Sequence, residues 1–286
     1  MTDFQQFIKD LRNKAIELSF QEDSYLGDHT STACIDENST NAVSLKVKDK
    51  GIISGVEVAR SVLLYSDPRI EIEVFIVDGS KVNFGDIVFK AYGPARSILK
   101  AERILLNLMQ RMSGIATKTA EYVDKIKDTK AKLLDTRKTA PCLRYFDKEA
   151  VIHGGGHNHR YGLFDMIMIK DNHIDFAGGI EKAVAKTKEY LQRNNLNLAI
   201  EVETRSLDDV KRVLEIEGIN RIMLDNFSIE NTHKAVRLVN GFFEVESSGG
   251  ITLENIREYA LCGVDFISVG ALTHNVKGLD LSLKAI

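Results

Sequence analysis

The sequence is poor in cysteine and proline, and both shortages narrow what the chain can be. Its three cysteines, Cys34, Cys142 and Cys262, are odd in number, widely spaced and without a C-x-x-C pair. A disulfide framework and a zinc site are therefore not expected, and a reducing cytoplasm is the expected location. Only three prolines occur, so we expect no flexible proline-rich linker between domains.

Long apolar runs and an excess of one charge are also missing. No segment is apolar for long enough to span a bilayer, and residues 1–20 lack the continuous apolar core of a signal peptide. The net charge of −3 gives no general attraction for polyanions, so neither nucleic acid nor a membrane is an expected partner. Residues 1–20 instead predict an amphipathic helix. Its expected buried face consists of Phe4, Phe7, Ile8, Leu11, Ala15 and Leu18.

The apolar content is sufficient for one large domain or two modest ones. Hydrophobic residues form 44% and charged residues 28% of the 286 residues, as in ordinary globular proteins. Residues 1–112 predict an α+β domain, because short alternating segments are separated by turn signals. A helix over 98–112 is expected to lead into the second domain. The other expected elements are strands at 42–47, 51–54, 70–77 and 86–92 and a helix at 56–65.

Residues 113–286 predict a parallel sheet, because apolar strands alternate with helix-like stretches. This segment is shorter than the ~250 residues of a complete eight-stranded barrel, so an incomplete β/α barrel and an open doubly wound sheet are both possible. Packing of its C-terminal segment back on the first domain is a further possibility. The expected strands are 133–135, 166–169, 198–200, 222–224, 243–246 and 266–269, with a seventh near 151–152.

Charged residues follow the first two of these strands, and the carboxyl ends of parallel strands meet at one edge of a barrel. Arg137 and Lys138 follow the first strand, and Lys170 ends the second. Arginine matches a carboxylate bidentately, and lysine suits phosphate as a mobile point charge. An isolated Arg-Lys pair is most often part of a solvated loop, but a second basic strand end favours an anion site.

A glycine triplet at 154–156 runs into a polar segment that ends in His159 and Arg160. Glycine lets backbone N–H groups approach a ligand, so we expect a ligand-binding loop that uses these two side chains. A structural turn is the alternative. Metal ligation by His157 and His159 has weak support, because no third nitrogen or sulfur ligand is nearby in the sequence.

Acidic residues end the next two strands. Glu201 and Glu203 are two residues apart on a strand and share a face, and Asp225 ends the following strand. Such carboxylates suit Mg²⁺, which binds through one or two carboxylates and the phosphates of a substrate. General acid–base chemistry, or structural ion pairs with Lys138 and Lys170, are the alternatives.

The segment 247–250, Ser-Ser-Gly-Gly, lies between a strand and a helix expected to open near 252–255. A small, glycine-rich turn at a helix N-terminus is suited to phosphate, and Gly270 ends the next strand as the barrel phosphate site requires. Taken alone, this segment fits a plain turn equally well.

Taken together, these motifs resemble the quinolinate phosphoribosyltransferase family. The resemblance covers nearly the whole chain, with one departure, Cys142, where the family usually has glycine between Pro141 and Leu143. We expect this thiol to be dispensable for the chemistry. The matching segments are 21–31, 101–117, 135–139 (DTRKT), 154–165, 169–173 (IKDNH), 201–203 (EVE), 224–227 (LDNF) and 247–252 (SSGGIT).

The resemblance implies an N-terminal α+β open sandwich (1–112) and an incomplete, about seven-stranded β/α barrel (113–286). It also implies a homodimer whose sites are shared, with Arg103 supplied by the partner subunit. Catalytic roles fall on Lys138, Lys170, Glu203 and Asp225, and Glu203 and Asp225 organise Mg²⁺. The implied substrate-binding residues are Arg103, Arg137, Lys138, Thr139, His159, Arg160, Lys170, Glu203, Asp225, Ser248, Gly249, Gly250 and Gly270.

The implied reaction joins quinolinate to 5-phosphoribosyl-1-pyrophosphate, with loss of pyrophosphate and CO₂, to give nicotinate mononucleotide. A paralogous phosphoribosyltransferase with a different acceptor is the main alternative. An aldolase-like barrel with Lys138 or Lys170 as Schiff base, and an inert binding protein, are weaker alternatives.

Overall fold

The computed structural model describes residues 3–286, which fall into two compact units. The first unit combines Met1–Ala120, Lys138–Gly155 and Leu272–Ile286, and the second combines Glu121–Arg137 and Gly156–Ala271. Each unit therefore brings together segments that are distant in the sequence.

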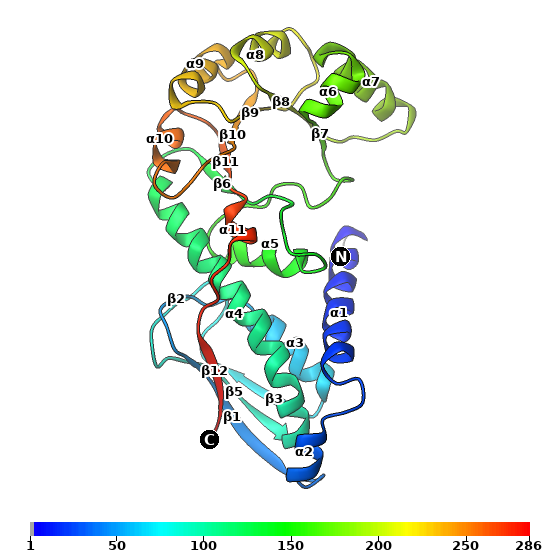
Figure 1. The fold of residues 1–286 in the computed structure, drawn as a ribbon, viewed down its shortest axis with the longest axis vertical. Helices are drawn as coiled ribbons and strands as arrows, with labels where there is room; N and C mark the ends of the chain where they lie inside the picture. Colours follow the sequence, from blue (N-terminus) through cyan, green and yellow to red (C-terminus); the bar gives the residue numbers. More distant parts are fainter. Residues whose placement is uncertain (1–2) are drawn as a thin grey trace. The chain divides into compact units, whose positions relative to one another are not determined.

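The first unit contains an antiparallel sheet with the strand order β12-β1-β5-β3. Its C-terminal strand β12 pairs along β1, from Val43↔Ala285 to Val47↔Leu281 (Figure 1). The strand β12 was not among the expected elements, and neither was β4. The strands are β1 (Thr40–Val47), β3 (Glu71–Val74), β5 (Ile87–Pro94) and β12 (Leu281–Ala285), and a separate pair is formed by β2 (Gly51–Ile52) and β4 (Lys81–Val82).

The helices of the first unit differ from expectation in number and in length. Helix α4 runs from Ala95 to Ile126, well beyond the predicted 98–112, and leads from the first unit into the second. Helix α2, His29–Cys34, was not among the expected elements and is capped by the Asp28 carboxylate, which accepts from the backbone N–H of Ser31. The remaining helices are α1 (Asp3–Asp23), α3 (Val56–Ser66), α5 (Arg144–His153) and α11 (Ala271–His274).

The predicted buried face of α1 is wrong. Phe7 and Leu18 are exposed to 45% and 55%, whereas Ile16 and Phe20 are buried. The ring centre of Phe20 lies 5.0 Å from that of Tyr65 and 5.8 Å from Lys100 Nζ. The buried residues of α1 are therefore Ile16 and Phe20, four positions apart, and not the apolar face that the periodicity indicated.

The second unit is an incomplete β/α barrel. Within residues 3–286, its parallel sheet has the strand order β6-β11-β10-β9-β8-β7, and His157 forms a further parallel bridge to Leu134 on the free side of β6. The strands therefore follow chain order around a ring with a gap before β7, which excludes a doubly wound sheet. The strands are β6 (Lys132–Leu134), β7 (Ile167–Ile169), β8 (Ile200–Thr204), β9 (Arg221–Asp225), β10 (Glu244–Ser248) and β11 (Phe266–Ser268).

The six clearly predicted strands are confirmed, but the seventh is wrong. Val151 and Ile152 lie in helix α5, where Phe146, Ala150 and Val151 are buried at helical spacing. A two-residue apolar run has no periodicity of its own that distinguishes a strand from a helix.

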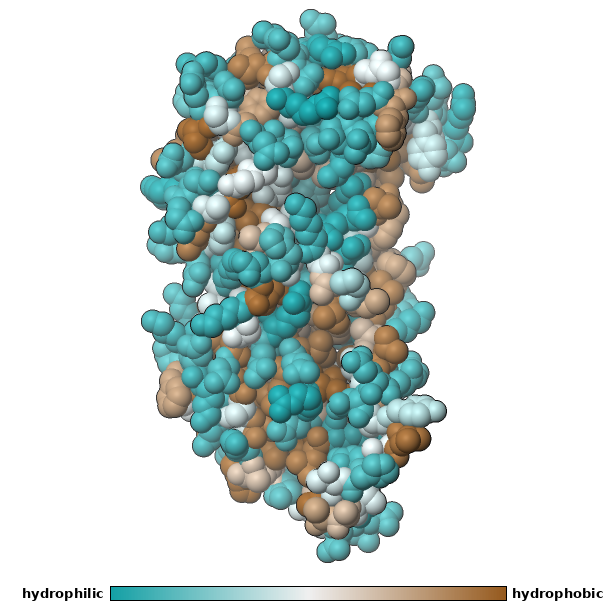
Figure 2. All heavy atoms as spheres, viewed as in Figure 1, coloured by the Kyte–Doolittle hydropathy of each residue, from teal (hydrophilic) through white to brown (hydrophobic). Residues whose placement is uncertain are grey.

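Outer helices cover the convex side of this sheet (Figure 1). Ser206 and Ser228 cap α8 and α9 by accepting from Asp209 N–H and Asn231 N–H. Figure 2 shows mainly hydrophilic side chains over these helices, as expected for helices that bury one face. In the described part of the chain, no helix is long and apolar enough to cross a membrane. The outer helices are α6 (Asp171–Ala177), α7 (Ile180–Arg193), α8 (Leu207–Leu214), α9 (Ile229–Val239) and α10 (Ile256–Leu261).

Candidate active site at the carboxyl ends of the parallel strands

The end of β6 holds the loop that follows the glycine triplet. Asp135 is fully buried, and its Oδ1 accepts from the backbone N–H of His159 at 2.8 Å. The backbone N–H of Asp135 donates to the carbonyl of His157 at 3.1 Å. This pairing brings the loop that carries Arg160 alongside the strand end that carries Arg137. The role of Asp135 is visible only in the structure.

Arg137 and Arg160 lie near enough for the charge of one guanidinium group to act on the other. The Nε atom of Arg137 is buried and has no hydrogen-bond partner within residues 3–286. Arg160 donates from Nη1 to the carbonyl of Met166 at 3.1 Å. Burial, and then the charge of Arg137, lower the pKa of Arg160. An unsatisfied buried donor beside a second cation is stabilised by an anion, and planar guanidinium groups favour carboxylates.

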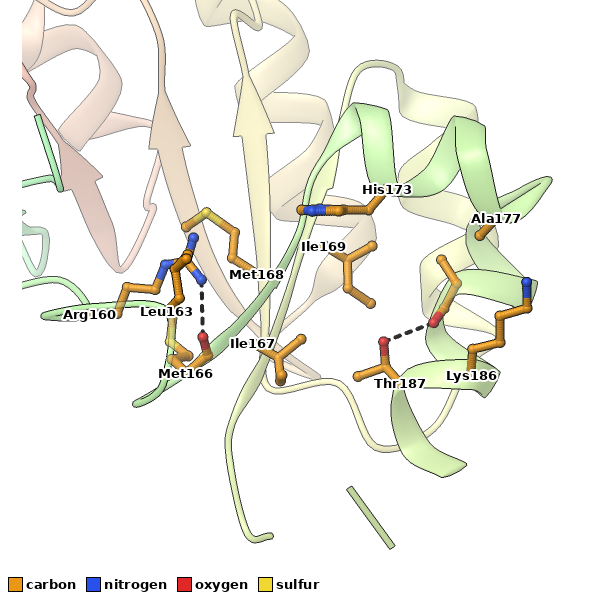
Figure 3. A pocket seen from close by; sticks show the side chains of 11 residues that line it. Arg160, Leu163, Met166, Ile167, Met168, Ile169, His173, Ala177, Lys186 and Thr187 are labelled. Atoms are coloured by element: carbon orange, nitrogen blue, oxygen red, sulfur yellow. Dashed lines mark hydrogen bonds between the residues drawn. The ribbon is translucent and has the colours of Figure 1, made fainter. Parts of the chain in front are cut away.

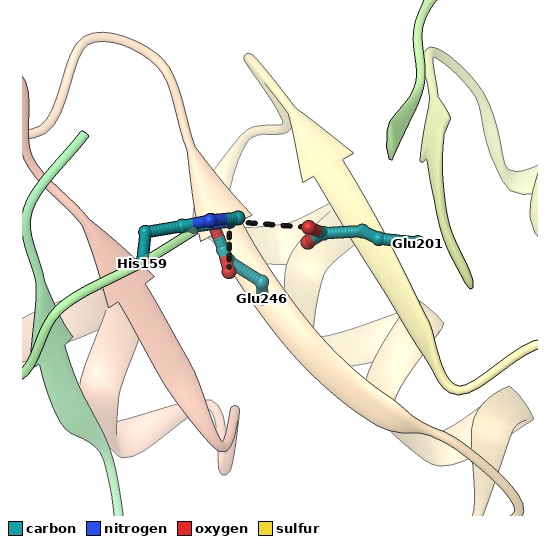
Figure 4. Close-up of side chains that lie close together, drawn as sticks. All are labelled: His159, Glu201 and Glu246. Atoms are coloured by element: carbon teal, nitrogen blue, oxygen red, sulfur yellow. Dashed lines mark ion pairs between the residues drawn. The ribbon is translucent and has the colours of Figure 1, made fainter. Parts of the chain in front are cut away.

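His159 lies in a buried cluster with Glu201 and Glu246 (Figure 4). Its Nε2 is 3.1 Å from Glu201 Oε2 and 3.4 Å from Glu246 Oε2. Its Nδ1 lies 2.6 Å from the backbone nitrogen of Arg160, and its Nε2 faces the two carboxylates. Burial opposes a positive ring, but the two carboxylates outweigh it and raise the pKa of His159 to about 9. Burial, and then the charge of Glu246, raise the pKa of Glu201 to about 7.

Arg221 completes this cluster. It contacts Glu246 through Nη1 and Glu244 through Nη2, each at 3.0 Å, and its guanidinium carbon lies 3.8 Å from the ring centre of Phe266. The ligand atoms of His159, Glu201 and Glu246 lie within 4.8 Å of one another, a spacing that a metal could use. Because a guanidinium and an imidazole N–H already engage these carboxylates, we interpret the cluster as an ion-pair network. Glu246 and Arg221 were not predicted from the sequence. A signal for Glu246 was available, because Glu244 and Glu246 are two residues apart on one strand and point to the same face.

Glu203 and Asp225 end the neighbouring strands β8 and β9. Glu203 is buried, and its carboxylate lies 3.8 Å from Lys170 Nζ, so one of the ion pairs considered as an alternative is present. Burial raises the pKa of Glu203, with Lys170 opposing and the nearby Asp225 charge adding to the rise. Two neighbouring carboxylates repel each other when both are ionised, and a hard divalent cation relieves this repulsion. Mg²⁺ binds through one or two carboxylates in this way.

The turn after β10 has the backbone that a phosphate site needs. Gly249 and Gly250 have φ of 87° and 62°, in the left-handed region that glycine favours. The helix predicted to open near 252–255 is present, because Asn255 is the N-cap of α10, which begins at Ile256 and has six residues. Any phosphate here would be bound by the N–H groups of the turn, as in an anion-binding nest, rather than by a long helix dipole. Ser248 ends β10, and Gly270 follows β11.

Other predicted residues belong to the first unit. Lys138 and Thr139 open its second segment, and Arg103 is exposed on α4. Thr139 Oγ1 accepts from Arg144 Nε at 3.2 Å. Cys142 has φ of 63°, so it occupies the left-handed conformation that glycine adopts most readily, which strains a residue that has a Cβ.

An apolar pocket of about 320 Å³ lies beside β7, between the 160–166 loop and helices α6 and α7 (Figure 3). Among the predicted site residues in the described chain, it contains Arg160 alone. Ile167 on β7 faces Thr187 on α7 across it. The predicted site residues of the second unit therefore lie mainly at the charged strand ends and not in this pocket.

Comparison with known families agrees with this geometry. The family described as "Quinolinate phosphoribosyl transferase, C-terminal domain" matches residues 115–284, and its N-terminal counterpart matches residues 28–113. This chain belongs to the quinolinate phosphoribosyltransferase family.

Similar proteins carry the same family names. A chloroplastic nicotinate-nucleotide pyrophosphorylase (carboxylating) of Arabidopsis thaliana is 48% identical over 284 residues, covering 94% of this chain and 81% of that protein. A probable enzyme of the same name from Bacillus subtilis is 38% identical over 270 residues, covering 94% and 92%. The crystal structure of NadC from Streptococcus pyogenes matches with a TM-score of 0.90 at 37% identity, covering 100% of this chain and 99% of that chain.

Proposed function

We propose that this protein transfers the phosphoribosyl group of 5-phosphoribosyl-1-pyrophosphate to quinolinate, releasing pyrophosphate and CO₂ and leaving nicotinate mononucleotide. The pairing of Arg137 with Arg160 carries the proposal. Two close guanidinium groups, one with a buried and unpartnered Nε among the described residues, call for a ligand with two carboxylates. Quinolinate is such a ligand, and it is the acceptor in the family to which the chain belongs.

The remaining charged side chains divide between the two substrates. Lys170 joins the two arginines on the carboxylates of quinolinate, with His159 in the same loop as Arg160. The turn formed by Ser248, Gly249 and Gly250, together with Gly270, takes the 5-phosphate of the ribose through backbone N–H groups.

Glu203 and Asp225 would hold Mg²⁺ on the ribose and pyrophosphate side of the site. When bound, the ion neutralises charge on the departing pyrophosphate. The carboxylates themselves offset the positive charge that builds on the ribose ring as the bond at C1 breaks.

The arginine pair also serves the chemistry by orientation. It fixes the pyridine nitrogen against C1 of the ribose, which removes most of the entropic cost of the encounter. The nitrogen forms the new bond to C1 while the C1–O bond to pyrophosphate breaks. The 2-carboxylate then leaves as CO₂, its bonding electrons remain on the ring carbon beside N⁺, and a proton completes the product. No enzyme nucleophile takes part, so Cys142 has no chemical role.

We further propose a homodimer in the cytoplasm in which Arg103 of the partner subunit completes each site. The exposure of Arg103 on α4 supports this arrangement, because an exposed basic side chain is available to a neighbouring subunit.

Pyrophosphate release tests the function. The purified protein is incubated with phosphoribosyl pyrophosphate and Mg²⁺, with quinolinate or nicotinate as acceptor, and Lys170→Ala serves as the inactive control. Release with quinolinate alone, with one CO₂ per pyrophosphate, is the expected result. Release with neither acceptor from folded protein would contradict the proposal and favour a paralogue with a different acceptor.

A further inference from the structure

Asn226 lies between two parts of the proposed phosphoribosyl site. It follows β9 directly after Asp225, with φ of 55°, in the left-handed region that asparagine tolerates better than most residues. Its backbone N–H donates to the carbonyl of Ser248 at 2.8 Å, which extends the pairing of β9 with β10 by one residue. The residue thus joins two strand ends.

The side chain of Asn226 reaches both neighbours. Its Nδ2 donates to Asp225 Oδ2 at 2.8 Å, which holds one carboxylate oxygen and leaves the other available. On the other side, Asn226 packs against Gly249 so closely that a Cβ added there would lie 2.3 Å from its Oδ1 and 2.6 Å from its Cγ. Gly249 is therefore required for two reasons, its positive φ and this contact.

The far side of the same turn is held separately. Asn255 Nδ2 donates to the carbonyl of Gly250 at 3.1 Å, and its Oδ1 accepts from Thr252 N–H at 2.8 Å. With one asparagine on each side, the turn is held to the end of β9 by Asn226 and to the start of α10 by Asn255. The side that faces Asp225 depends on Asn226.

We propose that Asn226 is a positioning residue that sets the distance between the Asp225 carboxylate and the Gly249 turn. This inference rests on the proposed function, in which these two groups contact the ribose side and the 5-phosphate of the same substrate. A sugar phosphate held at both ends gains affinity when the two contacts are preorganised at the right separation. Asn226 therefore acts on phosphoribosyl pyrophosphate and not on quinolinate.

Asn226→Gly tests the role, because glycine keeps the positive φ and removes the side chain. We expect the Kd for phosphoribosyl pyrophosphate, measured by calorimetry without quinolinate, to rise on the order of tenfold, as for loss of one hydrogen bond to a charged group. The KM for quinolinate should stay within about twofold of the wild type. Asn240→Gly is the matched control, since Asn240 also has a positive φ (46°) but caps α9.

Two further variants separate the contacts. Asn226→Asp keeps the shape but places a carboxylate beside Asp225, and it should weaken binding of the same substrate. Gly249→Ala should do so by displacing the Asn226 side chain, and Asn226→Gly combined with Gly249→Ala should be less damaging than the sum of the two.

The outcomes discriminate between the two proposals. An active wild type with an Asn226→Gly variant of unchanged Kd for phosphoribosyl pyrophosphate would overturn the role of Asn226 alone. The role of Asn226 is also overturned if binding of both substrates weakens equally while the melting temperature falls well below that of Asn240→Gly. A folded wild type that neither binds nor turns over phosphoribosyl pyrophosphate would overturn the proposed function, and this inference with it.

Discussion

At the scale of single residues, the site is built from groups that are unfavourable without a ligand. Arg137 has a buried Nε without a partner in the described chain, and Arg160 has its charged form disfavoured by burial and by Arg137, which lower its pKa. Glu203 is likewise buried near a second carboxylate. Such groups reduce the stability of the empty protein and become favourable when complementary charges bind.

Arg137→Ala should separate binding from stability. Truncation of one partner of a desolvated charge pair costs ~2–4 kcal/mol, so the KM for quinolinate should rise roughly 30-fold or more. Because the repulsion on Arg160 is removed at the same time, the melting temperature should not fall. Steady-state kinetics and thermal unfolding check both points, with the exposed Arg193→Ala as control. Normal saturation by quinolinate would contradict the assignment of Arg137.

Asp225→Asn should raise the Mg²⁺ concentration needed for half-maximal pyrophosphate release, by on the order of tenfold, because a neutral amide oxygen attracts a hard cation less than a carboxylate does. A magnesium titration at saturating substrates measures it. Asp208→Asn is the control, since Asp208 is exposed on α8 and paired with Lys211. If both variants have the wild-type requirement, Asp225 is not a metal ligand.

At the scale of secondary-structure elements, the strand ends were the most predictable part of the molecule. The apolar runs before Lys170, Glu203 and Asp225 are each confirmed as strands. In a parallel sheet the carboxyl ends of the strands share one edge, so the residues that follow each strand were enough to predict which residues form the site. Short elements such as β4 and α2 were missed, because a few residues carry too little periodicity.

Helix packing depended on contacts that periodicity does not encode. Helix α4 is linked to α5 by a bidentate ion pair in which Arg111 Nε and Nη2 each lie 2.7 Å from an Asp147 oxygen. Asp147 is fully buried and also accepts from the backbone N–H of Ala140, in the segment that begins with Lys138. The ion pair therefore stabilises the loop as well as the helices.

Arg111→Ala should destabilise the protein by about 3–5 kcal/mol, because it leaves the buried Asp147 carboxylate without its cation. Chemical denaturation measures the free energy of unfolding. Arg257→Ala removes an exposed ion pair to Asp128 and should change the free energy of unfolding far less, because solvent screens that pair. Equal costs for the two variants would show that the Arg111–Asp147 pair is not effectively buried.

At the scale of the whole molecule, the two units cannot be separated by one cut in the sequence. The matched family domains meet between residues 113 and 115, whereas the first unit also takes 138–155 and the C-terminal strand β12. Truncation near residue 280 would therefore remove a sheet strand that pairs with β1, not a dispensable tail.

Subunit mixing tests the shared site. Arg103→Ala and Lys170→Ala should each be inactive, but a random mixture contains heterodimers with one intact site. If Arg103 acts on the partner's site, the mixture should recover about a quarter of wild-type activity. A mixture of Arg137→Ala with Lys170→Ala, two changes in the same barrel, should recover none. No recovery in the first mixture, with heterodimers confirmed by native mass spectrometry, would contradict a shared site.

The sequence by itself determined the parallel strands, the charged residues at their ends and the family, because these depend on local patterns and on motifs that are contiguous in the chain. Which charges face one another became known from the folded arrangement of the strands and loops. The pairing of His159 with Glu201 and Glu246, the support of Asp147 by Arg111, and the contact of Asn226 with Gly249 join residues 23 to 87 positions apart. Contacts of that range depend on strand order and on which side of each loop is buried, and no local pattern records either.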